Sequence, residues 1–417
     1  MISFTNQIQN RSDDGEEWSL LIAGDCFLKG RDDRASIGEG VAKKIQTADI
    51  SVANLEGVIN SNGAPIDKVG PHLEMAVETP RLLSEAGFDL VTLANNHTMD
   101  YDVSGFRSTT AACARSGLST VGAGECEETA IEPFVTTIGS TSIAIYNLCE
   151  REFGVAKFDS PGTAWISHPN AKSVVREGVA TYDVVVLIAH GGIEYVPFPP
   201  LQRQRQLRSF IDLGVDAVIG HHPHVPQGWE RHNGRPVFYS LGNFLMYIKR
   251  RPSTRWGMVV KLTFDEDRLL SAQPMLTQIE GESVSMLTNA EAHWKYLTRL
   301  SSITQDHDRL EPYWQEIAMR EYERRYSRSP NPLVECVGIL LRRMKYGSSR
   351  PKRYQLQKLN HLRNESQRAV IETALEIKTG VRVDVRTEQV SKDVDQLLLW
   401  TNDDLPTLVT RIQKAVS

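Results

Sequence analysis

The sequence contains few cysteines, and none is arranged for a disulfide framework or a thiolate metal site. Five cysteines occur in 417 residues, an odd number, and no two form a Cys-x-x-Cys pair. Small secreted domains that depend on disulfides carry dense, evenly numbered cysteines, so that class is excluded. This cysteine usage predicts a reducing environment, the cytoplasm.

Long hydrophobic runs are also missing. No uninterrupted apolar stretch approaches the roughly 20 residues needed to span a bilayer. The first residues, MISFTNQIQNRSDDGEE, lack the basic start, apolar centre and small-residue cleavage site of a signal peptide. We therefore expect no transmembrane segment and no export signal, and we expect residues 1–17 to form a flexible tail.

Neither sign of charge dominates the chain. The net charge is -5 at pH 7, with 24% charged and 41% hydrophobic residues, which is ordinary for a soluble globular protein. The one local exception lies between Arg320 and Arg368, where basic residues outnumber acidic ones, most densely at Arg342–Lys345 and Arg350–Arg353. Such a stretch is either a solvated helical face or a contact for an anionic partner.

Short runs rich in Val and Ile alternate with amphipathic stretches over residues 18–280. This alternation is typical of α/β proteins. Gly87 and Gly214 each follow an amphipathic stretch, at a position where glycine commonly ends a helix. After residue 280 helix-forming residues dominate, so we predict a mainly helical C-terminal region over residues 281–417.

Residue types that bind metals follow several of the apolar runs. The clearest case is the segment Gly220-His221-His222-Pro223-His224, directly after the apolar run at residues 216–219. Three histidines at one corner add little to a core, and a metal ion would give them a role. Because the carboxyl ends of parallel strands meet in one crevice, we expect a single site. The predicted ligands are Asp25, Glu56, Asn96, His190, His222 and His224.

This mixed set of oxygen and nitrogen donors suits Mn, Fe or Zn better than Ca or Mg, and it fits one or two ions. His221 is either an alternative ligand or a residue that supports one. Glu56 on its own could also belong to a simple turn with a helix-capping role.

Three further residues are candidates for acid–base chemistry. His97 directly follows Asn96 and could reach past the metal to a leaving group. Asp100 either orients His97 by accepting its second ring proton or is an ordinary acid in the first turn of a helix. Glu194 acts either as a general base or as a hydrogen-bond partner of a ligand. Asn243 either lines the cleft or stabilises a turn.

Taken together, these motifs resemble the CapA family of capsule and poly-γ-glutamate synthesis proteins, which have a calcineurin-like metallophosphoesterase fold. The matching stretches are Gly24-Asp25, Asn54-Leu55-Glu56, Leu93–His97 with Asp100, His190–Tyr195, Gly220–His224 and Ser240–Phe244. The resemblance implies an α/β fold, a four-layer α-β-β-α sandwich with a metal site at the sheet edges. It also implies the six ligands above, with His97 as proton donor or phosphate contact.

The sequence departs from that pattern at two positions. Calcineurin-like phosphoesterases begin with Asp-x-His, but Phe27 stands where the histidine would be, and Glu56 replaces the usual aspartate. Two functions therefore stay open. One is a metal-dependent hydrolase or transferase acting on a phosphoester or an amide-linked anionic polymer. The other is a non-catalytic, metal-stabilised component that binds polymer or other capsule-biosynthesis proteins. A nucleic-acid enzyme is less favoured, because aromatic residues are sparse in the basic region.

Overall fold

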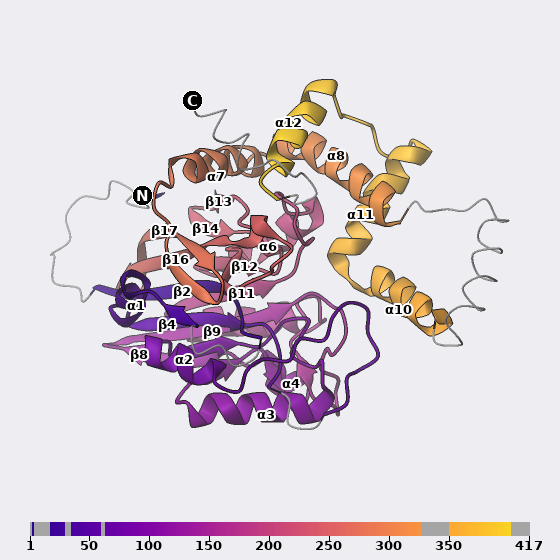
Figure 1. The fold of residues 1–417 in the computed structure, drawn as a ribbon. Coiled ribbons are helices and arrows are strands. Elements are labelled where there is room, and N and C mark those ends of the chain that lie inside the picture. Colours follow the sequence, from indigo (N-terminus) through magenta and orange to yellow (C-terminus); the bar gives the residue numbers. More distant parts are fainter. Residues whose placement is uncertain (1, 4–16, 30–34, 60–62, 327–349, 402–417) are drawn as a thin grey trace.

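The structure, a computed structural model, describes residues 2–3, 17–29, 35–59, 63–326 and 350–401. Two sheets dominate these residues (Figure 1). The first contains β1 (Ile2–Ser3), β2 (Glu17–Phe27), β3 (Ser36–Ile37), β4 (Ile50–Leu55), β5 (Leu90–Thr92), β6 (Ser119–Val121), β15 (Asn243–Met246), β16 (Trp256–Asp265), β17 (Arg268–Glu280) and β18 (Ser283–Met286). The second contains β8 (Phe134–Ile138), β9 (Thr141–Cys149), β11 (Val184–His190), β12 (Ala217–His221), β13 (Trp229–His232) and β14 (Arg235–Phe238). A short ribbon pairs β7 (Ala123–Gly124) with β10 (Gly162–Thr163).

Helices connect and cover the strands. They are α1 (Glu39–Gln46), α2 (Thr79–Ala86), α3 (Asp102–Arg115), α4 (Glu127–Ile131), α5 (Ala171–Thr181), α6 (Leu201–Leu213), the 3-10 helix η1 (Pro252–Thr254), α7 (Glu291–Thr304), α8 (His307–Arg325), α10 (Arg350–Arg363), α11 (Glu365–Thr379) and α12 (Glu388–Leu398). Gly87 and Gly214 end α2 and α6 in the left-handed conformation, which confirms the predicted helix ends. None of the described helices is long and apolar enough to cross a membrane.

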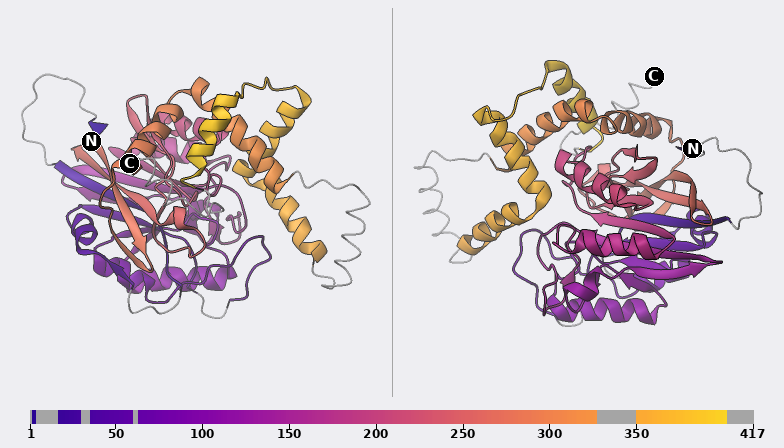
Figure 2. Two further views of the ribbon diagram at one scale, coloured as in Figure 1. Left: turned by 45° about the horizontal axis from the view of Figure 1, so that its top comes forward. Right: turned by 180° about the vertical axis from the view of Figure 1, so that it is seen from behind.

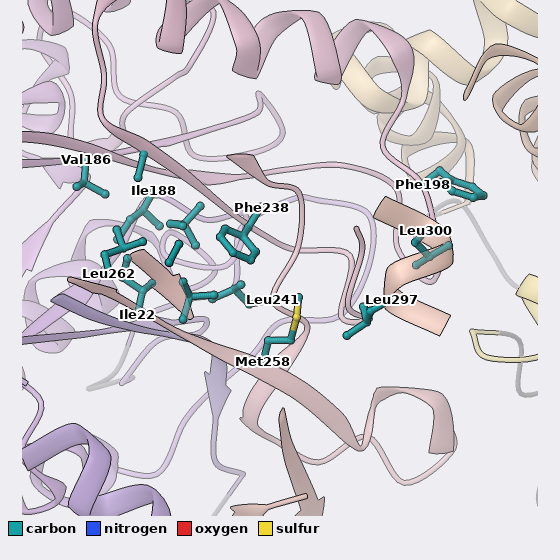
Figure 3. Packing of buried hydrophobic residues seen from close by; sticks show 14 of the residues in the cluster. Ile22, Val186, Ile188, Phe198, Phe238, Leu241, Met258, Leu262, Leu297 and Leu300 are labelled. Carbon is teal, nitrogen blue, oxygen red and sulfur yellow. The ribbon is translucent and has the colours of Figure 1, made fainter. Parts of the chain in front are cut away.

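The burial pattern of the strands shows four layers. Successive side chains of a strand point to opposite faces of a sheet. Leu20 and Ile22 of β2 join Val186 and Ile188 of β11 in the core between the two sheets, part of which Figure 3 shows. Leu21 of β2 packs instead in a second core, which includes residues of α1, α2 and α3.

The opposite face of the second sheet completes the sandwich. Val185 and Leu187 of β11 lie in a third core with Val175 of α5 and Phe210 of α6. Helices therefore cover both outer faces, and the predicted four-layer α-β-β-α sandwich is confirmed. The register is parallel between β2 and β4, between β4 and β5, and between β11 and β12, so their carboxyl ends meet at one edge of the sandwich.

The C-terminal region is mainly helical among the described residues, although it begins with the strand β18. Helices α8, α10, α11 and α12 gather on one flank of the sandwich, and Figure 2 shows this arrangement from two further directions. The basic stretch Arg342–Lys345 and residues 4–16 of the predicted N-terminal tail lie outside the described residues. Ile2 and Ser3 pair with β17.

Candidate metal centre

The six predicted ligands come from five strand ends that meet at one edge of the sandwich. Asp25 lies near the end of β2, Glu56 directly follows β4, and Asn96 lies in the turns after β5. From the second sheet, His190 ends β11, and His222 and His224 follow β12. The six lie close together, although they span about 200 residues of sequence, as expected for the carboxyl ends of parallel strands.

Their donor atoms form two groups that share Glu56. One group consists of Asp25, Glu56 and His224, and the other of Glu56, His190 and His222. Within each group the donor atoms lie within 4.8 Å of one another. Donors at about 2.0 to 2.3 Å from one ion lie at most about 4.6 Å apart, so this spread is close to that of a real metal site.

Glu56 gives the strongest sign that a cation belongs here. Its side chain is fully buried, and neither carboxylate oxygen has a hydrogen-bond partner among the described residues. His224 Nε2 is the nearest histidine nitrogen, 3.7 Å from Oε1. Burial raises the pKa of Glu56 well above its ordinary range, in spite of the nearby His224. Because a buried, unsatisfied carboxylate costs free energy, a cation between the histidines would offset that cost.

Asp25 is held by several hydrogen-bond donors. Asn54 Nδ2 donates to its Oδ1 at 2.7 Å, and the backbone N–H of His222 donates to Oδ2 at 3.4 Å. His224 Nδ1 lies 3.4 Å from the same Oδ2. Burial alone would raise the pKa of Asp25, but the hydrogen bond with His224 and the charges of neighbouring histidines lower it. Asp25 is therefore an ionised oxygen donor at neutral pH.

His190 and His222 are neutral nitrogen donors. His222 Nδ1 and Asn96 Oδ1 each lie 3.1 Å from His190 Nε2. Burial lowers the pKa of His190 well below its ordinary value and lowers that of His222 to about 4. Neutral imidazole is the form that binds metals.

The backbone of the segment Gly220–His224 is strained at two of its histidines. His222 and His224 have φ angles of 101° and 58°, in the left-handed region that residues other than glycine rarely adopt. Such strain is commonly found at functional sites, where it orients side chains.

His224 differs from the other two histidines in its protonation. Although burial opposes its charge, Glu56 and Asp25 raise the pKa of His224 to about 10, so a cation binding there would have to displace a proton.

His97 and Asp100 form a buried pair beside these donors. His97 Nδ1 lies 2.7 Å from Asp100 Oδ2, and His97 Nε2 lies 4.0 Å from Glu56 Oε1. The Lys68 ammonium contacts Asp100 Oδ1 and lies 3.1 Å from His97 Nδ1. Burial and the Lys68 charge lower the pKa of His97, although Asp100 opposes the shift. Asp100 thus contacts the ring of His97, the partner that was predicted for it. The Nε2 atom of His97 faces the donor groups.

The remaining predicted residues occupy different places. Burial would raise the pKa of the half-buried Glu194, but the charges of His222 and His224 lower it, which keeps a carboxylate beside the histidines. Asn243 Oδ1 lies 3.0 Å from His224 Nδ1, so Asn243 contacts the site. Its amide nitrogen donates to Met246 O at the other end of β15, across the irregularity in that strand. His221 belongs to neither donor group.

Phe27 is half-buried and packs against the core beneath α1 and α2, so it brings no donor to the site.

Two residues that contact the site, Asn54 and Lys68, were not predicted from the sequence. Asn54 Nδ2 donates to Asp25 and also lies 3.3 Å from His190 Nδ1, which links the two donor groups. An asparagine in a buried strand directly before Leu55 and Glu56 is a signal that could have identified it.

The region that contains the donor groups matches a known protein family. The sequence profile described as "Bacterial capsule synthesis protein PGA_cap" matches residues 15–247. The chain is 33% identical over 258 residues to the PGA biosynthesis protein CapA of Bacillus subtilis (strain 168), covering 58% of this chain and 66% of that protein. It is 30% identical over 182 residues to the capsule biosynthesis protein CapA of Bacillus anthracis, covering 42% and 44%. The chain thus spans less than two thirds of the length of these curated relatives.

Among solved structures, the calcineurin-like phosphoesterase YfkN from Bacillus subtilis is similar with a TM-score of 0.38 at 13% sequence identity, covering 68% of this chain and 98% of that chain. The profile match covers more than half of the 417 residues and includes all six predicted ligands. The resemblance to the CapA family is thereby confirmed, and the chain belongs to the bacterial capsule synthesis protein PGA_cap family.

Proposed function

We propose that this protein is a metal-dependent hydrolase or transferase that acts on a phosphoester or an amide-linked anionic polymer during capsule or poly-γ-glutamate production. The observation that carries the proposal is the buried Glu56 carboxylate, which has no hydrogen-bond partner among the described residues and lies between the two sets of histidines. The names of the curated relatives support the biological setting. Other capsule-biosynthesis proteins as partners, and a cytoplasmic location, stay predictions.

Two ions fit the donor groups, with Glu56 shared between them. Asp25, Glu56 and His224 would hold one ion, and Glu56, His190 and His222 the other, with Asn96 Oδ1 beside His190. The donor chemistry favours Mn, Fe or Zn. When bound, such an ion supplies Lewis acidity toward a substrate oxygen.

The chain's own residues supply proton transfer. Asp100 accepts from His97 Nδ1, so Nε2 is the atom that can give a proton to a leaving group or take one from it. Lys68 holds Asp100 in place through its contact with Oδ1. Glu194 keeps a carboxylate beside His222 and His224, where it can act as a base or hold a ligand.

The first experiment is elemental analysis of the purified wild type and of a His222→Ala, His224→Ala double variant. Hydrolysis of an aryl phosphodiester with added Mn²⁺ is measured in parallel. A His168→Ala, His232→Ala double variant is the control, because these two histidines pair with Glu127 and Asp212 away from the site. We expect metal and turnover to be lost in the first variant and kept in the control. No metal in the reconstituted wild type would overturn the proposal.

Phe27 favours the alternative, a non-catalytic component that binds polymer and uses metal for stability, because one donor of the phosphoesterase pattern is replaced by a core residue. The His97→Ala variant separates the two functions. If the site is catalytic, the variant keeps its metal while turnover falls by about 10²- to 10⁴-fold, the usual contribution of a general acid or base. A non-catalytic protein would show no turnover that depends on His97.

A further inference from the structure

The turn that follows β11 places an aromatic ring beside the candidate ligand His224. The backbone N–H of Tyr195 donates to Pro223 O at 2.9 Å, which ties this turn to the histidine segment. The centroids of the Tyr195 and His224 rings lie 5.9 Å apart. Tyr195 has a φ angle of 63°, which is rare for a bulky residue and is a form of strain often found at functional sites.

Arg251 stacks on the same ring. Its guanidinium carbon Cζ lies 4.2 Å from the centroid of the Tyr195 ring, a cation–π contact. The guanidinium therefore lies within about 10 Å of the His224 ring, a distance that about three residues of an extended peptide cover. Arg251 is half-buried, so solvent reaches part of its side chain. A substrate at the metal centre would thus have a cation close by, on the side of His224.

The backbone of Arg251 is fixed by its neighbours. Its N–H donates to Ile248 O at 2.9 Å. Its carbonyl accepts from Thr254 N at 3.0 Å and from Thr254 Oγ1 at 2.7 Å. Thr254 belongs to η1 and is fully buried. The side chain of Arg251 therefore starts from a structured loop, four residues beyond the segment 15–247 that matches the family profile.

A stacked guanidinium is suited to binding an anion. The stacking occupies the face of the planar group, whereas its N–H donors lie in its plane. This fork of donors matches the two oxygens of a carboxylate or a phosphate. A second guanidinium contacts the same turn. Arg325 of α8, which pairs with Glu321, donates from Nη2 to Glu194 O at 3.4 Å.

We propose that Arg251 determines specificity by binding an anionic group of the substrate, a carboxylate or a phosphate, next to the metal centre. The inference rests on the proposed metal-dependent function. It assigns to the chain after β15 a contact with the substrate in addition to the metal ligands themselves.

The test is the affinity of Mn²⁺-loaded protein for a labelled hexaglutamate peptide, measured by fluorescence anisotropy in wild type and in Arg251→Met. Methionine keeps much of the length of the side chain but removes the charge and the donors. Loss of a charge-assisted hydrogen bond typically weakens binding about tenfold, so we expect a loss of that size. Arg251→Lys should recover only part of it, because an ammonium keeps the charge without the planar fork.

The phosphate source is tested with the same variants. If the anion that Arg251 binds is a phosphate of the substrate, Arg251→Met should raise the KM for an aryl phosphodiester more than it lowers kcat. If the anion is a carboxylate, the loss should appear with hexaglutamate instead. Either result supports the inference and identifies the chemistry of the anion.

Arg255→Met is the matched control. It removes an equal charge from the same loop, where Arg255 stacks at 5.0 Å on Tyr247 and donates to Lys249 O. This variant should bind hexaglutamate as wild type does. Hexaglutamine, the neutral probe, should bind wild type and Arg251→Met equally.

Three results would overturn the inference and leave the metal site intact. The first is an Arg251→Met variant in which neither the hexaglutamate affinity nor the KM changes. The second is an equal loss in Arg255→Met, which would indicate a nonspecific charge effect. The third is an equal loss for hexaglutamine, which would indicate a structural role. Failure of the wild type to bind metal would instead overturn the proposed function.

Discussion

Asp216 is a half-buried carboxylate remote from the donor groups, and the fold opposes its ionisation. It lies just before β12, where its Oδ2 accepts from Val185 N at 2.9 Å and its Oδ1 lies 3.1 Å from Arg235 Nη2. Burial raises its pKa from 3.8 to about 6 in spite of these contacts. The folded state therefore holds this proton more tightly than the unfolded chain does. The stabilisation is greatest at low pH and is lost as the pH rises from about 4 to about 6.

We expect the Asp216→Asn variant to lose this pH dependence. Each pKa unit corresponds to about 1.4 kcal/mol, so the free energy of unfolding of the variant should gain up to about 3 kcal/mol relative to wild type between about pH 4 and pH 7. Urea unfolding of both proteins at several pH values measures the difference. Asp159→Asn, at an exposed position, is the control. A difference that stays constant with pH would show that the pKa of Asp216 is not raised.

Residue types alone predicted the donors of the candidate site but not the residues that hold them. Acidic and imidazole side chains are unusual at the ends of apolar runs. This contrast identifies Asp25, His190 and His222 in the sequence. Lys68 could not be found in this way, because it lies in a loop between β4 and α2 whose path no periodicity specifies.

At the scale of elements, the close pairing of β2 with β15 determines the position of Asp25. Asn243 lies opposite Asp25 in the register of these two strands. A Cβ atom on Gly24 would lie 2.0 Å from Gly242 O, so only glycine allows the two backbones to approach this closely. The approach matters for the site, because Asp25 and Asn243 both contact His224.

The Gly24→Ala variant should therefore lose both stability and metal affinity. Overpacking of a tight contact typically costs about 1 to 3 kcal/mol, and separation of β2 from β15 would also pull Asp25 away from His224. Urea unfolding of the metal-free protein and a metal titration measure the two effects. Gly40→Ala is the control, because Gly40 lies in α1 with room for a methyl group, where alanine favours the helix. Unchanged values in Gly24→Ala would show that the strands can separate without cost.

The alternation of apolar and amphipathic runs predicted the α/β class, because period-two burial and helix ends are local properties. The four layers were predicted only as an implication of the resemblance to the CapA family. It could not predict which strands share a sheet. Strand β15 pairs with β2, more than 200 residues earlier, and this pairing depends on contacts that are distant in sequence. The left-handed backbone of His222 and His224 could not be predicted either, since only a small share of residues other than glycine adopt it and the residue type alone does not specify it.

At the scale of the whole molecule, the core between the sheets continues into the C-terminal helices. Leu297 and Leu300 of α7, which Figure 3 shows next to one another, belong to the same buried cluster as Trp314 of α8 and Ala369 of α11. The division of the chain near residue 280 stays a prediction. The sandwich and the C-terminal helices nevertheless share a core, so each stabilises the other. We therefore expect the sandwich and these helices to unfold together.

Replacement of Trp314 tests this cooperativity. Its side chain is fully buried, and its Nε1 donates to Thr373 Oγ1 of α11 at 3.0 Å. Truncation of a buried aromatic side chain to alanine typically costs about 3 to 5 kcal/mol. If the core is one unit, Trp314→Ala should reduce hydrogen-exchange protection in β11 as much as in α11, because both would exchange through the same global opening. Val383→Ala, at a position that is 76% exposed, should leave both unchanged. If α11 lost protection while β11 kept it, the helices would form a separate unit that opens before the sandwich itself unfolds.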